Sequence, residues 1–259
     1  MFKRLISSAL LAGAAAGLIA ALLQFVFVQP VLLHAELYET GELTHFVPVD
    51  HGEASGSGHD HGAAAQTPEA SGSEAAGSSS HAAHPGIDFA RDGLSVLFSL
   101  VVYAGYGLFL TAAMALAASR GVEITARQGL IWGVAGFAAV QLAPAFGLSP
   151  ELPGMSAADV VERQIWWLGT VVATAVGLWL IAFGRNWAFW GLAVALILAP
   201  QLIGAPHPDE FFGPTPPELA AQFAGRALGV GLAAWATLGL AAGWLWSREP
   251  ETALAPQTA

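Results

Sequence analysis

The chain has 259 residues, of which 55% are hydrophobic and 11% charged, and it contains no cysteine. Soluble domains carry about 25% charged residues, so this composition excludes an ordinary soluble globular protein. The lack of cysteine excludes disulfides and thiolate metal sites, so a metal would be held by imidazole and oxygen ligands.

Six apolar segments are long enough to cross a bilayer as helices, and none has a charged residue or a histidine in its interior. They cover residues 5–28, 93–118, 128–147, 164–183, 187–204 and 227–246. The sequence therefore predicts an all-α polytopic membrane protein with six transmembrane helices.

The first of these segments also has features of a secretory signal. MFKRLISSALLAGAAAGLIAALLQFVFVQP begins with basic residues, which precede an apolar stretch with small side chains. The apolar run of about 24 residues is longer than the usual core of a signal peptide, so we expect it to be retained as a membrane helix. Cleavage would leave five spans.

The chain is expected to divide into four parts. Residues 1–33 form the first helix with a short N-terminus, and residues 34–90 form an outer, histidine-rich loop. Residues 91–248 supply the other five helices, and residues 249–259 form a tail.

The flanking charges predict the orientation of the helices. With the N-terminus inside, six of the nine basic residues are cytoplasmic and sixteen of the nineteen acidic residues face outward. The outer face then has a net charge of −13 and the inner face +3. Both termini are therefore expected in the cytoplasm, with the histidine-rich loop in the periplasm or outside the cell.

A weak threefold repeat links the outer ends of the odd-numbered spans. These ends read QFVFVQPVLLHAEL, VQLAPAFGLSPELPG and APQLIGAPHPDEFFG, each with glutamine near proline and a carboxylate further on. The pattern favours three helical hairpins, with the histidine-rich segment inserted into the first. The alternative is chance, because membrane helices often end in proline.

The repeat, if real, places polar groups on a path through the bundle. Each proline lacks an N–H, which frees a carbonyl that is tolerated at membrane depth only inside protein or beside a wet cavity. Glutamine amides would add further oxygens, and together these groups could replace part of the hydration shell of a cation. The alternative is plain hydrogen bonding between helices. The candidate path residues are Gln24, Gln29, Pro30, Gln141, Pro144, Pro200 and Gln201.

Four G-x-x-x-G pairs predict close helix packing without indicating a function. They are Gly13–Gly17, Gly129–Gly133, Gly225–Gly229 and Gly239–Gly243.

Residues 50–86 contain five of the eight histidines and no lysine or arginine. Their Gly, Ser and Ala content predicts disorder, and the spacing of histidines and acids is typical of a metal-binding tract. The alternative is a soluble spacer in which histidine is incidental. The candidate ligands are His51, His59, Asp60, His61, His81 and His84.

A second set of candidate metal ligands lies just beyond two repeat-equivalent spans. His34 and Glu36 follow the first span, and His207, Asp209 and Glu210 follow the fifth. We expect these two groups to meet at one outer mouth. Alternatively, the acids pair with Arg163 or Arg226 in ordinary salt bridges.

Enzyme functions find no support in the sequence. There is no Walker A motif and no G-x-S-x-G nucleophile elbow, and no histidine lies inside a span to hold a haem. We therefore predict that the chain is not an enzyme and carries no prosthetic group.

Several stretches resemble the CbtA family of predicted cobalt transporter subunits. They are the basic start MFKRLISSALLAGAAAGLIAALLQ and the spans GIDFARDGLSVLFSLVVYAGYGLFL, RQIWWLGTVVATAVGLWLIA and APQLIGAPHPDEFFGPTPPELAAQF. The resemblance implies uptake of Co²⁺ linked to cobalamin synthesis, and a small single-span CbtB-like partner. It also strengthens the assignment of His207, Asp209 and Glu210. Members are usually described with about five spans, and residues 50–86 lie outside the resemblance.

The leading hypothesis is a subunit of an uptake transporter for cobalt, or for related divalent ions such as Ni²⁺ or Zn²⁺, in the bacterial cytoplasmic membrane. Its partners would be the lipid bilayer, a CbtB-like subunit and the ion, with no nucleic acid. The alternative hypothesis is a membrane metal-binding or sensor subunit that does not transport. Convergence of the glutamines and prolines on a polar cavity would favour transport.

Overall fold

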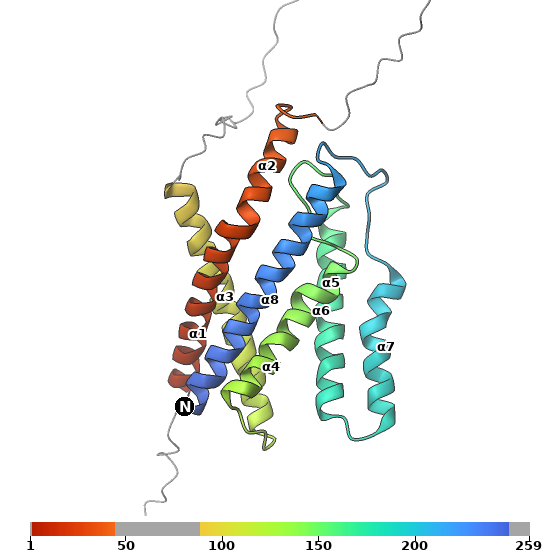
Figure 1. Ribbon diagram of the computed structural model, residues 1–259. Coiled ribbons are helices and arrows are strands. Elements are labelled where there is room, and N and C mark those ends of the chain that lie inside the picture. Colours follow the sequence, from red (N-terminus) through yellow and green to blue (C-terminus); the bar gives the residue numbers. More distant parts are fainter. Residues whose placement is uncertain (1, 45–88, 249–259) are drawn as a thin grey trace, which may run out of the picture. The chain divides into compact units, whose positions relative to one another are not determined.

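A computed structural model describes residues 2–44 and 89–248, and this part of the chain contains helices and connections but no strand. The α-helices are α1 (Phe2–Leu23), α2 (Gln29–Glu39), α3 (Phe89–Ala118), α4 (Ala126–Phe137), α5 (Ala143–Ala145), α6 (Val160–Phe183), α7 (Trp187–Ile203) and α8 (Pro217–Ser247) (Figure 1). Two π-helical turns, η1 (Gln24–Val28) and η2 (Ala138–Leu142), join α1 to α2 and α4 to α5.

The predicted all-helical membrane architecture is confirmed. Five helical segments are long and apolar enough to cross a membrane, and α7, with 17 residues, is a shorter apolar helix. The first segment, Leu5–Glu39, continues eleven residues past the predicted end at residue 28. It continues because Pro30 lies in the first turn of α2, where its missing N–H breaks no helical hydrogen bond.

Helix α8 lies at the centre of the helix contacts. It packs against α1 and α4, while α1 also packs along α3 and α6 packs along α7 (Figure 1). Of the three predicted hairpins, the first is therefore a close pair, whereas α4 has its main contact with α8 and α7 with α6. The small residues of α4 and α8 explain why these two helices pack closely on each other.

Three of the four predicted glycine pairs lie at helix crossings. Gly13 and Gly17 face the backbone of α3, and a Cβ built at Gly13 would lie 2.6 Å from the Cα of Ala104. Likewise, a Cβ at Gly239 would lie 2.6 Å from the Cα of Gly133, because the pairs of α4 and α8 pack directly on each other. The Gly225–Gly229 pair has no atom within 4 Å of either added Cβ, so it is not at a contact.

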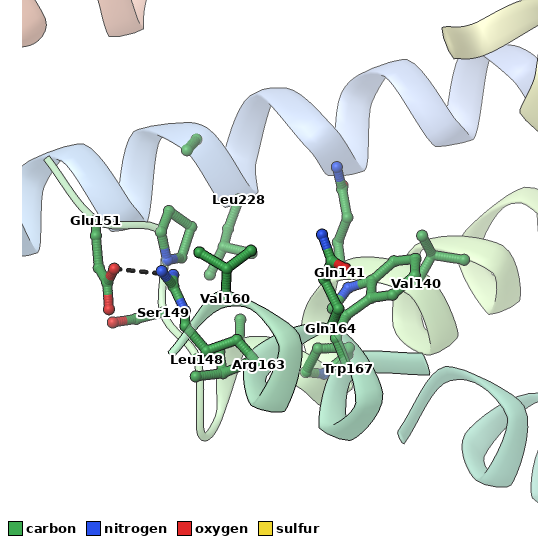
Figure 2. A pocket seen from close by; sticks show the side chains of 14 residues that line it. Val140, Gln141, Leu148, Ser149, Glu151, Val160, Arg163, Gln164, Trp167 and Leu228 are labelled. Atoms are coloured by element: carbon green, nitrogen blue, oxygen red, sulfur yellow. Dashed lines mark hydrogen bonds and ion pairs between the residues drawn. The ribbon is translucent and has the colours of Figure 1, made fainter. Parts of the chain in front are cut away.

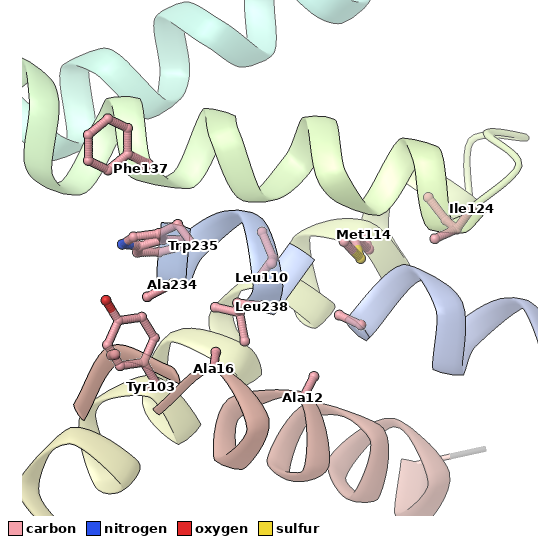
Figure 3. Close-up of a cluster of buried hydrophobic side chains, with 12 residues drawn as sticks. Ala12, Ala16, Tyr103, Leu110, Met114, Ile124, Phe137, Ala234, Trp235 and Leu238 are labelled. Atoms are coloured by element: carbon pink, nitrogen blue, oxygen red, sulfur yellow. The ribbon is translucent and has the colours of Figure 1, made fainter. Parts of the chain in front are cut away.

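The main core forms where α1, α3, α4 and α8 meet (Figure 3). Met114 and Leu238 are fully buried there. Trp235 of α8 is also buried and stacks on Tyr106 of α3 with ring centroids 4.8 Å apart. Aromatic pairs in this geometry add to the burial term, so this contact helps fix α3 against α8.

A second, smaller cluster joins α2 to the start of α8. Val31, Ala35, Leu152 and Leu219 are buried together, and Leu152 comes from the connection between α5 and α6. That connection also bonds to the one between α7 and α8, since the N–H of Ser156 donates to the carbonyl of Phe212 at 2.9 Å. We call this end of the bundle, which is formed by α2 and the connections 146–159 and 204–216, the α2 end.

Candidate functional site

The two π-helical turns support the predicted repeat. In η1 the N–H of Gln29 bonds to the carbonyl of Gln24, and in η2 the N–H of Ala143 bonds to the carbonyl of Ala138. Each turn ends two residues before a proline, Pro30 or Pro144. Such π-bulges are rare and often lie at functional sites. Their recurrence at repeat-equivalent positions therefore favours a real repeat over a chance pattern.

Side-chain donors bind a carbonyl within three residues of each of the three prolines. The Arg226 guanidinium donates to the Phe27 carbonyl at 3.1 Å. Gln201 Nε2 donates to the Ala143 carbonyl at 2.9 Å, and Trp166 Nε1 donates to the Pro200 carbonyl at 3.3 Å. These donors bind carbonyls other than the ones four residues before each proline, so the expectation that those carbonyls are freed stays a prediction.

Two repeat-equivalent glutamines meet at one groove. Gln24 of η1 and Gln141 of η2 both line a groove of about 510 Å³, which we call the central groove. Its other polar lining side chains all come from α3: Ser95, Ser99, Tyr103 and Tyr106. The hydroxyl of Ser99 donates to Oε1 of Gln24 at 3.4 Å. None of the residues that line this groove is charged.

The central groove adjoins two others through these glutamines. Gln141 also lines a groove of about 420 Å³ with Pro144, Glu151 and Arg163, called here the Arg163 groove. Gln24 also lines a groove of about 310 Å³, called the Glu36 groove. The polar residues of the Glu36 groove are Gln24, Gln29, Glu36, Asp92 and Ser95.

The side chain of Gln141 has an unusual environment. Its Oε1 atom is buried and accepts no hydrogen bond from the described residues. Oγ1 of Thr174 is also buried without a hydrogen-bond partner there. The indole N–H of Trp235 is likewise a buried donor without an acceptor there. Gly231 of α8 makes room for Gln141, because a Cβ at Gly231 would lie only 3.0 Å from its Cδ.

Gln201, the third glutamine of the repeat, has a structural role that Gln141 lacks. Replacing Gln201 with leucine is expected to cost about 1 kcal/mol in unfolding free energy, because the Ala143 carbonyl loses its shorter hydrogen bond. Replacing Gln141 with leucine is expected to leave stability unchanged or raised, because its Oε1 atom has no protein partner to lose. Thermal unfolding of the solubilised full chain measures both. A loss at Gln141 as large as at Gln201 would show that Gln141 also bonds within the fold.

Arg163 closes the far side of the Arg163 groove. Its guanidinium pairs with the Glu151 carboxylate at 2.9 Å, and Figure 2 shows this pair at one end of the groove and Gln141 at the other. Because Arg163 pairs with Glu151 and Arg226 bonds to the Phe27 carbonyl, the alternative in which these arginines pair with Asp209 or Glu210 is not what the structure shows.

His207 has one ring nitrogen next to a backbone acceptor. Its Nδ1 lies 3.1 Å from the Pro208 carbonyl, so the tautomer with the proton on Nδ1 donates there and leaves the lone pair of Nε2 available. Metal-binding histidines are usually oriented by such a second bond. His207 lines a groove with Glu162 of α6, and Asp209 and Glu210 are exposed beside it.

His34 and Glu36 lie on α2 rather than in a loop, because the helix continues past Pro30. The His34 ring is exposed and lies against Tyr38, with centroids 5.6 Å apart, while Glu36 is half-buried. No group of three or more His, Asp or Glu side chains that could hold a metal is found in residues 2–44 and 89–248. His51, His59, Asp60, His61, His81 and His84 lie outside the described residues.

None of the polar residues on the α3 side of the central groove was predicted from the sequence. Ser95, Ser99, Tyr103 and Tyr106 recur at intervals of three and four residues in a segment treated only as a span. That spacing places them on one helix face and was the available signal. Glu162 was also missed, and Glu151, although it is the carboxylate of the repeat segment that follows the third span, was not connected with Arg163.

Long apolar helices around a neutral polar groove define a polytopic α-helical membrane protein. The family model described as "Probable cobalt transporter subunit (CbtA)" matches residues 2–247, nearly the whole chain. The chain therefore belongs to the CbtA family. No curated protein and no solved structure matches it.

Proposed function

We propose that this protein is the membrane subunit of an uptake transporter for cobalt or a related divalent ion. The observation that carries the proposal is the convergence of Gln24 and Gln141 on the central groove. Polar residues inside a bilayer are costly, and their usual role is to line a path for an ion or substrate. The description of the matched family supports cobalt as the ion.

In this proposal the α2 end faces outward and collects the ion. With that orientation the outer side has a net charge of −13, which concentrates divalent cations near the bundle. The histidine-rich segment 50–86 captures metal. His34 and Glu36 of α2 and His207, Asp209 and Glu210 beyond α7 are the ligands of the mouth, although they do not form a group of three in the described residues. Gln29 and Pro144, which line the adjoining grooves, belong to the path, whereas Pro30, Pro200 and Gln201 support the backbone around it.

The second candidate is a membrane subunit that binds metal without transporting it. It is favoured by the side chains that cap the carbonyls of Phe27, Ala143 and Pro200, since these contacts close part of the expected polar path. Under this function the helices would act as an anchor for the histidine-rich segment.

Metal accumulation in metal-starved cells that express the full chain separates the two functions. Cobalt, nickel and zinc are measured with and without a CbtB-like single-span partner, as the family resemblance suggests. Cobalt accumulation that depends on this chain supports transport and its link to cobalamin synthesis. No accumulation in any combination, with metal still bound to the purified chain, would establish a binding subunit instead.

Deleting residues 50–86 is expected to raise the cobalt concentration needed for half-maximal uptake about tenfold and to leave the maximal rate unchanged. The segment supplies ligands that raise the local metal concentration, an effect that saturates when metal is plentiful. Uptake rates over a cobalt titration measure this. A control chain in which the five histidines of this segment are replaced by serine keeps the length of the segment and should behave like the deletion. Loss of uptake at every concentration would show that the segment is essential rather than accessory.

A further inference from the structure

We infer that the Arg163 groove binds a phospholipid whose headgroup carries both a phosphate and a primary ammonium group, as in phosphatidylethanolamine. The Arg163 guanidinium binds the phosphate, and the Glu151 carboxylate binds the ammonium group. The inference arises from the free hydrogen-bonding capacity of this ion pair, the apolar lining beside it and its place at one end of a membrane helix. It does not rest on the proposed function.

The Arg163 groove lies where the membrane helix α6 begins. Four of its lining residues recur at intervals of three and four positions and so share one face of α6. They are Val160, Arg163, Gln164 and Trp167. Arg163 lies at the end of the first turn of α6, and Trp167 follows about 6 Å further along the helix axis. Tryptophan prefers the level of the lipid headgroups, so the groove runs from that level toward the apolar layer.

The ion pair in this groove keeps most of its hydrogen-bonding capacity. A single contact joins the two side chains, from Nη2 of Arg163 to Oε2 of Glu151 at 2.9 Å. The planar guanidinium has further N–H donors, and these have no other partner among the described residues. The exposed fractions of the two side chains are 30% and 34%. A ligand can therefore reach both charges without breaking the pair.

The adjacent opposite charges match a zwitterionic headgroup. A guanidinium binds a phosphate through parallel N–H···O bonds, and a carboxylate accepts strong hydrogen bonds from an ammonium group. An anionic headgroup would bring a second negative charge close to Glu151, which is unfavourable. A choline headgroup has no N–H to donate to Glu151. A headgroup with a phosphate and a primary ammonium group satisfies both members of the pair.

The lining beside the pair suits the ester groups and the first part of the acyl chains. Gln164 is exposed next to Arg163, so its amide can donate to an ester carbonyl. Val140 of η2 and Leu228 of α8 supply apolar walls. Figure 2 shows the ion pair at one end of the groove and Val140 at the other. The groove is thus polar at the headgroup end and apolar further along.

The size of the groove fits part of a lipid rather than a whole one. Its volume of about 420 Å³ lies within the range of about 300–1,000 Å³ that is typical of small-molecule sites. The rest of the acyl chains would lie on the apolar surface of α6, where Leu168 is 56% exposed. Gln141 belongs to the lining of both this groove and the central groove, so the lipid adjoins the central groove without occupying it.

Native mass spectrometry of the purified full chain in detergent tests the inference. Phosphatidylethanolamine, phosphatidylcholine and phosphatidylglycerol with identical acyl chains are titrated separately, and the fraction of chains with one bound lipid is measured. We expect half-maximal binding of phosphatidylethanolamine at a concentration about tenfold or more below the other two, as for one additional hydrogen bond to a charged group. Arg163→Gln should weaken binding of all three lipids. Glu151→Gln should instead abolish the preference and improve binding of phosphatidylglycerol, a pattern that general damage to the fold would not produce.

Arg185→Gln is the matched control, because it removes the same charge from an exposed site just past the other end of α6 and should bind lipid like the wild type. Neither variant of the ion pair should unfold the chain, since exposed ion pairs contribute little to stability. Equal half-maximal concentrations for the three lipids, or an unchanged preference in Glu151→Gln, would overturn the inference and leave only nonspecific contact with the bilayer. The measurement involves no metal, so the inference and the proposed function can fail independently.

Discussion

Replacing Gly239 with isoleucine is expected to prevent the full chain from folding stably in the membrane. The pairs Gly129–Gly133 and Gly239–Gly243 bring the backbones of α4 and α8 into direct contact, and a Cβ at Gly239 would lie 2.6 Å from the Cα of Gly133. Backbone atoms cannot move away by a change of rotamer, so the two helices would have to separate.

The size of this effect follows from what the crossing supports. Overpacking a core usually costs about 1–3 kcal/mol, and a clash between two backbones lies at or above the upper end of that range. Separation of α4 from α8 would also open the core around Trp235 and Leu238. In addition it would move η2, which carries Gln141. Membrane protein yield and thermal unfolding of the solubilised chain measure the loss.

Helix α8 provides its own control for this prediction. Gly229 belongs to the same kind of G-x-x-x-G pair, but nothing lies within 4 Å of a Cβ built there. Gly229→Ile should therefore fold about as well as the wild type, with a small gain from helix propensity. Equal tolerance of isoleucine at Gly229 and Gly239 would contradict the crossing of α4 and α8.

The comparison of these glycine pairs shows what the sequence can and cannot predict. Apolar runs of sufficient length predict the helices directly, because a span must satisfy its own backbone. The pairs at Gly225 and Gly239 look the same in sequence, yet only the second is a contact. Which helix a glycine faces depends on the relative rotation of two segments far apart in the chain, and local patterns carry no information about that.

The candidate site was predictable to a similar degree. The glutamines near proline were visible as a repeat, and Gln24 and Gln141 do line one groove. Gln201 occupies the third repeat position but bonds to the Ala143 carbonyl instead. The difference arises because Pro200 lies inside α7, without the π-helical turn that precedes Pro30 and Pro144. A π-helical turn changes the direction of every following side chain, and the sequence repeat does not reveal where it occurs.

Replacing His207 with alanine and Asp209 with asparagine together is expected to lower cobalt accumulation by more than about 100-fold at every metal concentration, since even outer-shell partners of a metal cost 10–100-fold. When His207 Nδ1 donates to the Pro208 carbonyl, the lone pair of Nε2 is available for a metal ion. An imidazole that is already oriented by a second contact loses less freedom on binding a metal, so His207 is expected to contribute strongly to affinity. The double variant should therefore affect both the maximal rate and the half-maximal concentration, whereas the deletion of residues 50–86 should affect only the latter.

A charge-matched control distinguishes direct binding of the ion by His207 and Asp209 from general attraction of cations by the acidic surface. Glu218 is exposed in the first turn of α8, and Glu218→Gln removes the same charge as Asp209→Asn. If the acidic surface acted only by concentrating cations, the two single variants would reduce uptake equally, and both effects would vanish at high ionic strength. A loss of cobalt uptake that occurs only in the Asp209 and His207 variants and persists in high salt requires direct contact of these residues with the ion. Equal behaviour of the two single variants would instead leave the outer charge as the only contribution of this end of the bundle.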